Sequence, residues 1–237
     1  MKKILASILT LTLCLGLTAG CGSQSAAAPA ESNSADGSGV TEIPSLKIAF
    51  SPYADADQIT TATEPLEQLL QAKLLEKGYD VKVSEVHGMS QRGGSVVTYV
   101  RFGEKVYSPI VTRGEADFIV SFEKLEAARY ADCLKKGGRI IVNTQEIDPM
   151  PVLTGATDYP ADILEDLEKQ GVCVEKVDAL SLAEQAGSAK AVNTVLLARL
   201  SKYLPIEREK WEEAIATGVK PQFVAMNQKA FALGLED

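Results

Sequence analysis

The sequence has little cysteine and almost no histidine, and both shortages limit the chemistry that the chain can carry. Its 237 residues include four cysteines and one histidine. Cys14 and Cys21 fall in the apolar amino-terminal segment, which leaves Cys133 and Cys173, without C-x-x-C spacing. Because a cluster that needs four thiolates cannot be built from two, we expect no metal site. We expect Cys133 on a helix and Cys173 in a strand, both as small core residues.

The chain also lacks a basic face. Its 24 Lys and Arg residues stand against 32 Asp and Glu, which gives a formal net charge of -8. A nucleic-acid partner requires clustered basic residues, so we expect none. Hydrophobic residues at 46% are typical of a globular protein, and the length suffices for a buried core. The sequence therefore predicts one domain of moderate size plus a tail, or one and a half domains.

The first 21 residues are predicted to be a signal peptide. Lys2 and Lys3 precede an apolar run that is too short for a stop-transfer helix, and "TAGC" then ends at Cys21. This segment resembles a bacterial lipoprotein signal, in which Cys21 would be the lipidated residue. Thr18 departs from the pattern, because these signals favour Leu at that place. An ordinary cleaved signal peptide remains the alternative.

Residues 22–44 are predicted to be a flexible linker. They are rich in Ser, Ala and Gly, with no large apolar residue before Val40. Such a segment cannot bury enough surface to offset the entropy of ordering it, so we expect a disordered tether.

Residues 45–77 are predicted to form a strand, a loop and a helix. "SLKIAF" is a short apolar strand, and Leu66, Leu69, Leu70 and Leu74 recur at helical spacing between an N-cap at Thr63 and a stop at Gly78. The loop could offer hydroxyls and helix amides to an anion, although any polar loop that ends in a cap looks the same. The candidate anion-binding residues are Ser51, Tyr53, Thr61 and Thr63.

The stretch "LKIAFSPYADADQITTATEPLEQLL" resembles the mature start of phosphate/phosphonate-binding lipoproteins of ABC transporters. In those proteins a Ser-Pro segment after the first strand leads toward the oxyanion site. The resemblance implies a membrane-anchored binding protein. It covers only residues 1–80, and nothing after Val81 supplies the family's second lobe.

Residues 78–237 alternate strand and helix patterns. The predicted strands are "YDVKVSEV", "SVVTYVRF", a short strand after the turn "FGEKVYS", "ADFIVSF", "GRIIVN" and "VCVEKVDA". The predicted helices are "EKLEAARYADCL", ended by Gly137-Gly138, "PADILEDLEKQG", ended by Gly171, "SLAEQAG", "AVNTVLLARLSKYL", and two closing helices around Trp211 and residues 223–233. The alternation predicts an α/β fold with a mainly parallel or mixed sheet and covering helices.

The loop "HGMSQRGG" between two of these strands is longer than a tight hairpin needs. Its glycines allow close backbone approach, and its polar residues offer donors at a sheet end, where ligands and partners dock. We therefore predict a partner or substrate loop made of His87, Gly88, Ser90, Gln91, Arg92, Gly93 and Gly94. A solvated loop is the alternative. His87 is a weak catalytic candidate, because no nucleophile or ligand cluster accompanies it and a histidine that closes a strand is commonly structural.

The segments "GYDVKVSEVHGMSQRGGSVVTYVRFGEKVYSPIV", "GEADFIVSFEKLEAARY" and "GGRIIVNTQEIDPMPVLTG" resemble the beta subunits of indolepyruvate ferredoxin oxidoreductases, in the gamma-domain family of 2-oxoacid:ferredoxin oxidoreductases. The resemblance implies oxidative decarboxylation of aryl 2-oxoacids to acyl-CoA, with electrons passed to ferredoxin. It also implies that this chain binds no cofactor alone. Thiamine diphosphate and the iron–sulfur clusters would lie on a partner alpha subunit, ferredoxin and CoA would reach the complex, and the chain would be inactive without that partner.

The two resemblances conflict. The oxidoreductase family opens with a strand and a G-x-G-G-Q-G loop, where this sequence has "IAFSPYADADQ". We interpret the chain as a chimera, from recombination, a gene-model error or mixed reads, joined near Tyr79. The larger part implies a cytoplasmic oxidoreductase subunit, and the smaller part implies a lipid-anchored binding protein at the membrane.

Overall fold

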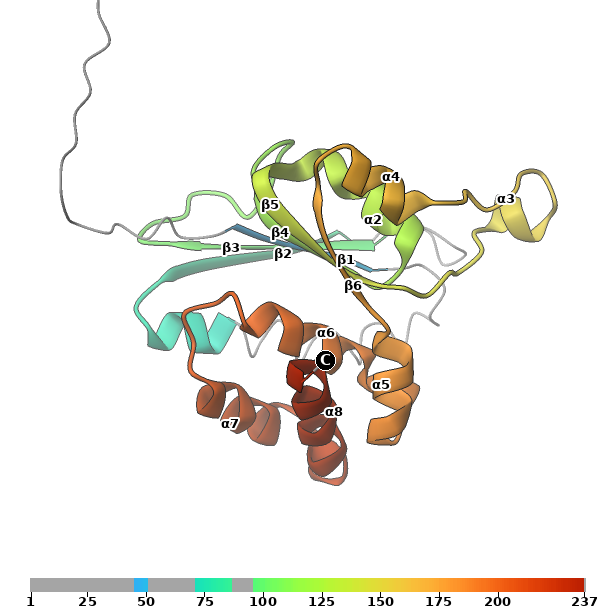
Figure 1. Cartoon of the computed structure of the whole chain (residues 1–237). Helices are drawn as coiled ribbons and strands as arrows, with labels where there is room; N and C mark the ends of the chain where they lie inside the picture. Colours follow the sequence, from blue (N-terminus) through green and yellow to red (C-terminus); the bar gives the residue numbers. More distant parts are fainter. Residues whose placement is uncertain (1–44, 51–70, 87–95, 237) are drawn as a thin grey trace, which may run out of the picture. The chain divides into compact units, whose positions relative to one another are not determined.

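A computed structural model describes residues 45–50, 71–86 and 96–236 (Figure 1). All of them belong to one compact unit, Thr41–Asp237. The predicted signal peptide and linker lie outside the described residues, and so do Cys21, the N-cap at Thr63, the 87–94 loop and the anion-binding candidates. Within the described ranges, no helix is long and apolar enough to span a membrane.

A six-stranded mixed sheet forms the centre of this unit, in the order β2-β3-β1-β4-β5-β6. The strands are β1 (Ser45–Phe50), β2 (Asp80–Val86), β3 (Val96–Gly103), β4 (Ala116–Ser121), β5 (Leu134–Asn143) and β6 (Cys173–Val177). β3 is antiparallel to both β1 and β2, whereas β1, β4, β5 and β6 are parallel neighbours. The predicted α/β fold with a mixed sheet is confirmed.

The inner strands are apolar on both faces because helices cover both. On β5, Ile140 and Val142 belong to one core cluster and Ile141 to the other, and all three are fully buried. Side chains that alternate across a strand must fill two separate cores when both faces are covered. The run "IIV" of residues 140–142 is therefore continuously apolar and does not alternate with polar residues.

Two helical layers supply these cores (Figure 1). One face carries α2 (Lys124–Tyr130), which η1 (Ala131–Cys133) extends, and α4 (Ile163–Lys169). The other face carries the helical residues 71–76 together with α5 (Ala179–Ala186), η2 (Ala189–Ala191), α6 (Val192–Ser201), α7 (Arg208–Gly218), η3 (Pro221–Phe223) and α8 (Val224–Glu236). The predicted stops at Gly78 and Gly171 are confirmed, since both adopt positive φ just after a helix.

The glycine pair at 137–138 is a correction. We expected it to end a helix, but it lies inside β5, which begins at Leu134. The pairing of β5 with β4 shifts register between Ala116 and Phe118, and Gly137 takes φ +80 there. A Cβ on Gly138 would come within 2.9 Å of the Asp117 carbonyl oxygen. The glycines therefore serve a bulged strand and a close backbone approach.

Three smaller expectations also differ from the structure. The short strand expected after "FGEKVYS" is absent from residues 104–115, all of which are described. Cys133 is buried as predicted, but Cys173 is exposed, because it opens the edge strand β6. We did not predict α3 (Met150–Leu153), a single helical turn, because Pro149 and Pro151 favoured a loop there.

Candidate functional site

Strand direction brings the chain's predicted loops to one edge of the sheet. β1, β2, β4, β5 and β6 all run the same way, so their carboxyl ends share this edge, which we call the carboxyl edge. Phe50 pairs with Val96 and Val86 pairs with Val97, so the chain enters both residues 51–70 and residues 87–95 from the carboxyl edge. Ligands of open α/β sheets bind at such an edge.

The predicted site residues themselves lie outside the described residues. They are His87, Gly88, Ser90, Gln91, Arg92, Gly93 and Gly94 in one loop, Ser51, Tyr53, Thr61 and Thr63 in the other, and Cys21. The structure shows where the strands deliver these two loops but not where the side chains lie, so their roles stay predictions.

A buried carboxylate, missed by the sequence analysis, organises the described part of the carboxyl edge. Glu123 follows β4 and is only 2% exposed. Its side chain caps α2 by accepting a hydrogen bond from the Glu126 amide at 2.9 Å, and it accepts a longer one, 3.5 Å, from the Ile147 amide. The Tyr159 hydroxyl also donates to Glu123. A glutamate at a helix start is usually a solvated cap, so its burial gave no sequence signal.

Two further buried polar residues tie the strand ends together. The Ser121 hydroxyl donates to the Glu123 carbonyl oxygen at 2.6 Å. The Asn143 Nδ2 donates to the Phe122 carbonyl oxygen at 3.1 Å, and its Oδ1 accepts from the Ala179 amide at 3.2 Å. Asn143 thus joins the ends of β4 and β5 to the start of α5. These hydrogen bonds fix the backbone at the ends of β4 and β5, because a buried polar network with satisfied donors and acceptors is rigid.

Tyr159 stays protonated at this edge over a wide pH range. Burial raises the pKa of its hydroxyl well above the ordinary value, and the hydrogen bond to Glu123 and that carboxylate's charge raise the pKa further. Tyr159 is therefore a fixed donor to Glu123.

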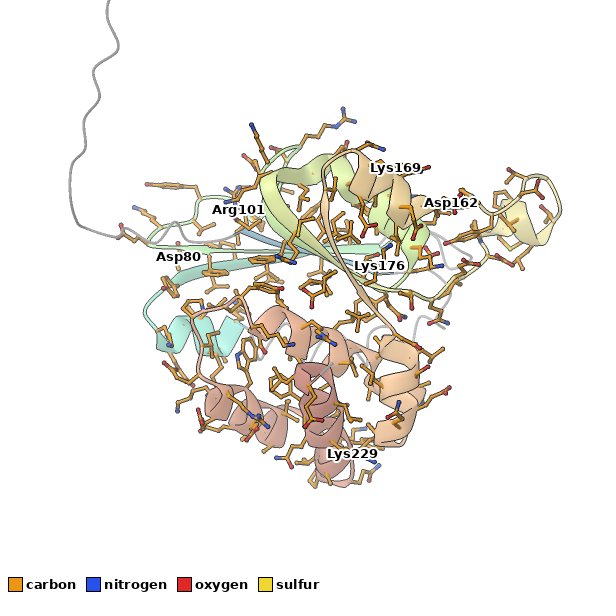
Figure 2. The ribbon with its side chains drawn as sticks, viewed as in Figure 1. Asp80, Arg101, Asp162, Lys169, Lys176 and Lys229 are labelled. Atoms are coloured by element: carbon orange, nitrogen blue, oxygen red, sulfur yellow. The ribbon has the colours of Figure 1, made fainter. Side chains whose placement is uncertain are left out.

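A cavity of about 150 Å³ lies between the end of β5 and α4. Its lining includes Lys124, Thr144, Glu146, Asp162, Glu165 and Lys176, of which Figure 2 labels Asp162 and Lys176. Four of these charged side chains form two ion pairs: Lys124 lies 2.8 Å from Glu146, and Lys176 lies 2.7 Å from Glu165. The hydrogen bond from Lys176 lowers the pKa of Glu165. Ligand pockets for drug-sized molecules usually exceed ~300 Å³, so this cavity is smaller than a typical pocket for a ligand of that size.

The described residues therefore position loops and do not themselves offer a reacting group. Across those ranges no three metal-ligating side chains come together. The donor set does not fit an iron–sulfur cluster, because Cys133 is buried and Cys173 is exposed, and four thiolates are needed.

Comparison with known proteins identifies close relatives. Residues 63–236 match the family model described as pyruvate ferredoxin/flavodoxin oxidoreductase. The indolepyruvate oxidoreductase subunit IorB of Thermococcus kodakarensis is 43% identical over 169 residues, which cover 68% of this chain and 83% of that protein. The subunit of the same name from Archaeoglobus fulgidus is 40% identical over 164 residues, with 68% and 81% covered.

Solved structures share the fold at lower identity. Pyruvate oxidoreductase subunit PORC from Thermotoga maritima matches with a TM-score of 0.57 and 21% identity, covering 82% of this chain and 97% of that one. The 2-oxoglutarate:ferredoxin oxidoreductase from Magnetococcus marinus matches with a TM-score of 0.56 and 17% identity, covering 81% of this chain but only 31% of that one.

Proposed function

The chain belongs to the pyruvate ferredoxin/flavodoxin oxidoreductase family, and from that membership we propose that it is the small subunit of an enzyme that oxidises indolepyruvate. That it is a 2-oxoacid:ferredoxin oxidoreductase subunit follows from its relatives. The observation that carries the proposed substrate is the 43% identity to a subunit named for indolepyruvate, over 83% of that subunit.

The proposed reaction is oxidative decarboxylation. An aryl 2-oxoacid loses CO₂, its acyl group is transferred to CoA, and the two electrons released reduce two ferredoxins. We propose that thiamine diphosphate and the iron–sulfur clusters belong to a large alpha subunit, because this chain's two remaining cysteines do not fit a cluster. Thiamine diphosphate would supply the carbanion stabilisation that decarboxylation of a 2-oxoacid requires. The complex would work in the cytoplasm, where ferredoxin and CoA are found.

We propose that this chain completes the site through the loops of the carboxyl edge. Residues 87–94 would contact the large subunit or the substrate, and the buried polar residues Ser121, Glu123 and Asn143 would keep the edge rigid beneath them. His87 remains a weak catalytic candidate of this loop, with a structural role as its alternative. Preorganised positioning of this kind contributes to catalysis even from residues that never touch the substrate.

We further propose that the chain is composite. Residues 1–21 would be a lipoprotein signal with Cys21 as the lipid site, residues 22–44 a linker, and the next strand and loop a segment from a phosphate/phosphonate-binding lipoprotein. The oxidoreductase match reaches back to residue 63, so we place the join at or before that residue. Long-read sequencing across the codons for residues 40–90 tests this proposal. Two separate intact genes there would mark the join as an artefact, and an uninterrupted single gene would mark it as real.

Substrate assays test the proposed function. The chain is combined with the large subunit, and ferredoxin reduction is measured with indolepyruvate, phenylpyruvate, pyruvate and 2-oxoglutarate in the presence of CoA. Because we propose that the opening segment is foreign, the assay uses a version in which a strand and G-x-G-G-Q-G loop replace the residues before residue 63. A preference of at least about tenfold for the two aryl substrates is expected. Equal or greater turnover of pyruvate would contradict the proposed substrate.

A further inference from the structure

A short arm leaves the carboxyl edge between β5 and α4. Residues 148–158 form this arm, with α3 at its tip, and Figure 1 shows it standing away from the sheet and helices. Met150 and Leu153 on α3 are 49% and 48% exposed. Isolated exposed apolar side chains are common on protein surfaces. Met150 and Leu153 indicate a binding surface only in combination with the hydrogen bonds that order the arm and fix its base.

The tip of the arm is stiff. The Thr154 hydroxyl donates to the Met150 carbonyl oxygen at 2.9 Å, and the Ala156 amide donates to the Pro151 carbonyl oxygen at 2.8 Å. Proline also fixes φ at positions 149 and 151, which reduces the conformations of the free chain. A surface that is already ordered loses little entropy when it binds.

The base of the arm is clamped at both ends by one buried group. Glu123 accepts from the Ile147 amide, just before the arm, and from the Tyr159 hydroxyl, just after it. Burial of a carboxylate is costly unless several donors compensate it. Connections from strands to helices usually need only about 2–6 residues, and this one is longer. Because the base is fixed and the connection is longer than it needs to be, we infer that the arm holds its tip out from the domain for binding.

The arm also has charge of one sign only. It carries Asp148 and Asp158 and no Lys or Arg. A partner that accepts it would combine an apolar hollow for Met150 and Leu153 with basic residues around the rim, as in interfaces that have an apolar centre and a polar edge.

We propose that residues 148–158 are a docking arm that inserts Met150 and Leu153 into an apolar, basic-rimmed socket on the large subunit. This inference rests on the proposed function. The occupant is a subunit of the same enzyme because the relatives are named as subunits, and because the same fold makes up 31% of the longer Magnetococcus marinus chain, joined there to the rest of an oxidoreductase.

The test compares two variants of the full chain. M150D/L153D places charges on the arm, and F223D places a charge at Phe223, which is 43% exposed and belongs to the other helical layer. Each is mixed with purified large subunit, and the Kd is measured by biolayer interferometry. We expect M150D/L153D to weaken binding at least about tenfold and F223D to change it less than about twofold. Thermal unfolding midpoints should stay within about 3 °C of the parent, because all three residues are exposed.

Hydrogen exchange gives a second measurement that needs no variant. The amides of residues 150–157 should exchange more slowly once the large subunit is added. Unchanged exchange there, or equal binding by M150D/L153D and the parent, would overturn the docking arm while leaving the proposed function intact. Loss of self-association in M150D/L153D with unchanged binding to the large subunit would assign the arm to a second copy of this chain and also overturn it. A parent chain that fails to bind the large subunit would remove the proposed function and the docking arm together.

Discussion

At the scale of single residues, Glu123 connects three parts of the described carboxyl edge. It caps α2, receives the Tyr159 hydroxyl and accepts from the Ile147 amide. From the sequence we predicted binding residues only in the loops, because exposed hydrogen-bond donors are typical of binding sites. Glu123 is only 2% exposed, but the sequence does not distinguish a buried glutamate from a solvated one, because burial depends on the fold.

Replacement of Glu123 with alanine should destabilise the protein by about 2–4 kcal/mol, because it leaves buried donors without an acceptor. Urea unfolding at pH 7 measures the loss. Glu146 provides the control: it pairs with Lys124 but is exposed, so E146A should cost less than about 1 kcal/mol. Equal losses in the two variants would show that Glu123 is not a structural centre of the edge.

Because of Tyr159, we expect the parent protein and Y159F to differ in how their stability changes at alkaline pH. Its folded pKa is raised, so the folded state keeps the proton while an unfolded tyrosine loses it above about pH 10. The contribution of Tyr159 is therefore full below that pH and declines as the pH rises above it. Urea unfolding at pH 8 and pH 10.5 should show a larger decline for the parent than for Y159F. Parallel declines would contradict the assigned environment of the hydroxyl.

At the scale of elements, the order of strands and helices was predictable and their ends were less so. Apolar runs such as "IVS" and "RIIVN" predict buried strands, and leucine spacing predicts helices. Gly137 and Gly138 were misjudged because a glycine pair after a helix usually ends it, whereas here the register of β4 against β5 requires them. We missed α3 because its prolines favoured a loop prediction. The hydrogen bonds from Ile147 and Tyr159 to the carboxylate of Glu123 depend on the fold and have no sequence signal.

The crossing of α6 and α8 depends on a glycine. A Cβ at Gly234 would lie 2.7 Å from the Val195 carbonyl oxygen and 2.8 Å from the Ala198 Cβ. G234A should therefore destabilise the protein by about 1–3 kcal/mol, although alanine favours a helix by about 1 kcal/mol over glycine. Urea unfolding measures the change. The control is A225G, at an exposed position of the same helix, which should cost no more than about 1 kcal/mol. Increased stability of G234A would contradict the close crossing.

At the scale of the whole molecule, β1 decides whether the domain folds as one unit. It lies between β3 and β4, so without it the sheet would fall into the pair β2-β3 and the group β4-β5-β6. The strand predicted to come from a foreign lipoprotein thus occupies the middle of the oxidoreductase fold. A foreign apolar strand of suitable length would be tolerated there, because sheet pairing uses backbone groups that every residue carries.

Two truncations test the role of β1. Removal of residues 1–40 should leave a cooperative thermal transition within about 4 °C of the parent, because all the described residues lie in the unit Thr41–Asp237. Removal of residues 1–50 also deletes β1 and should abolish the cooperative transition. Differential scanning calorimetry distinguishes the two, and cooperative unfolding of the shorter chain would show that β1 is not part of the folding unit.

The chain is an oxidoreductase subunit, and we propose that its fold is intact although its opening loop is replaced. Backbone pairing can survive such an exchange, but the donors of the family's G-x-G-G-Q-G loop cannot, because sites require placement within about half an ångström. The most direct measurement is indolepyruvate-dependent ferredoxin reduction by the large subunit with this chain lacking residues 1–21, compared with a version that restores the glycine-rich opening before residue 63. We predict that the restored chain is at least about tenfold more active. Equal turnover by the two chains would contradict the claim and show that the opening segment is dispensable.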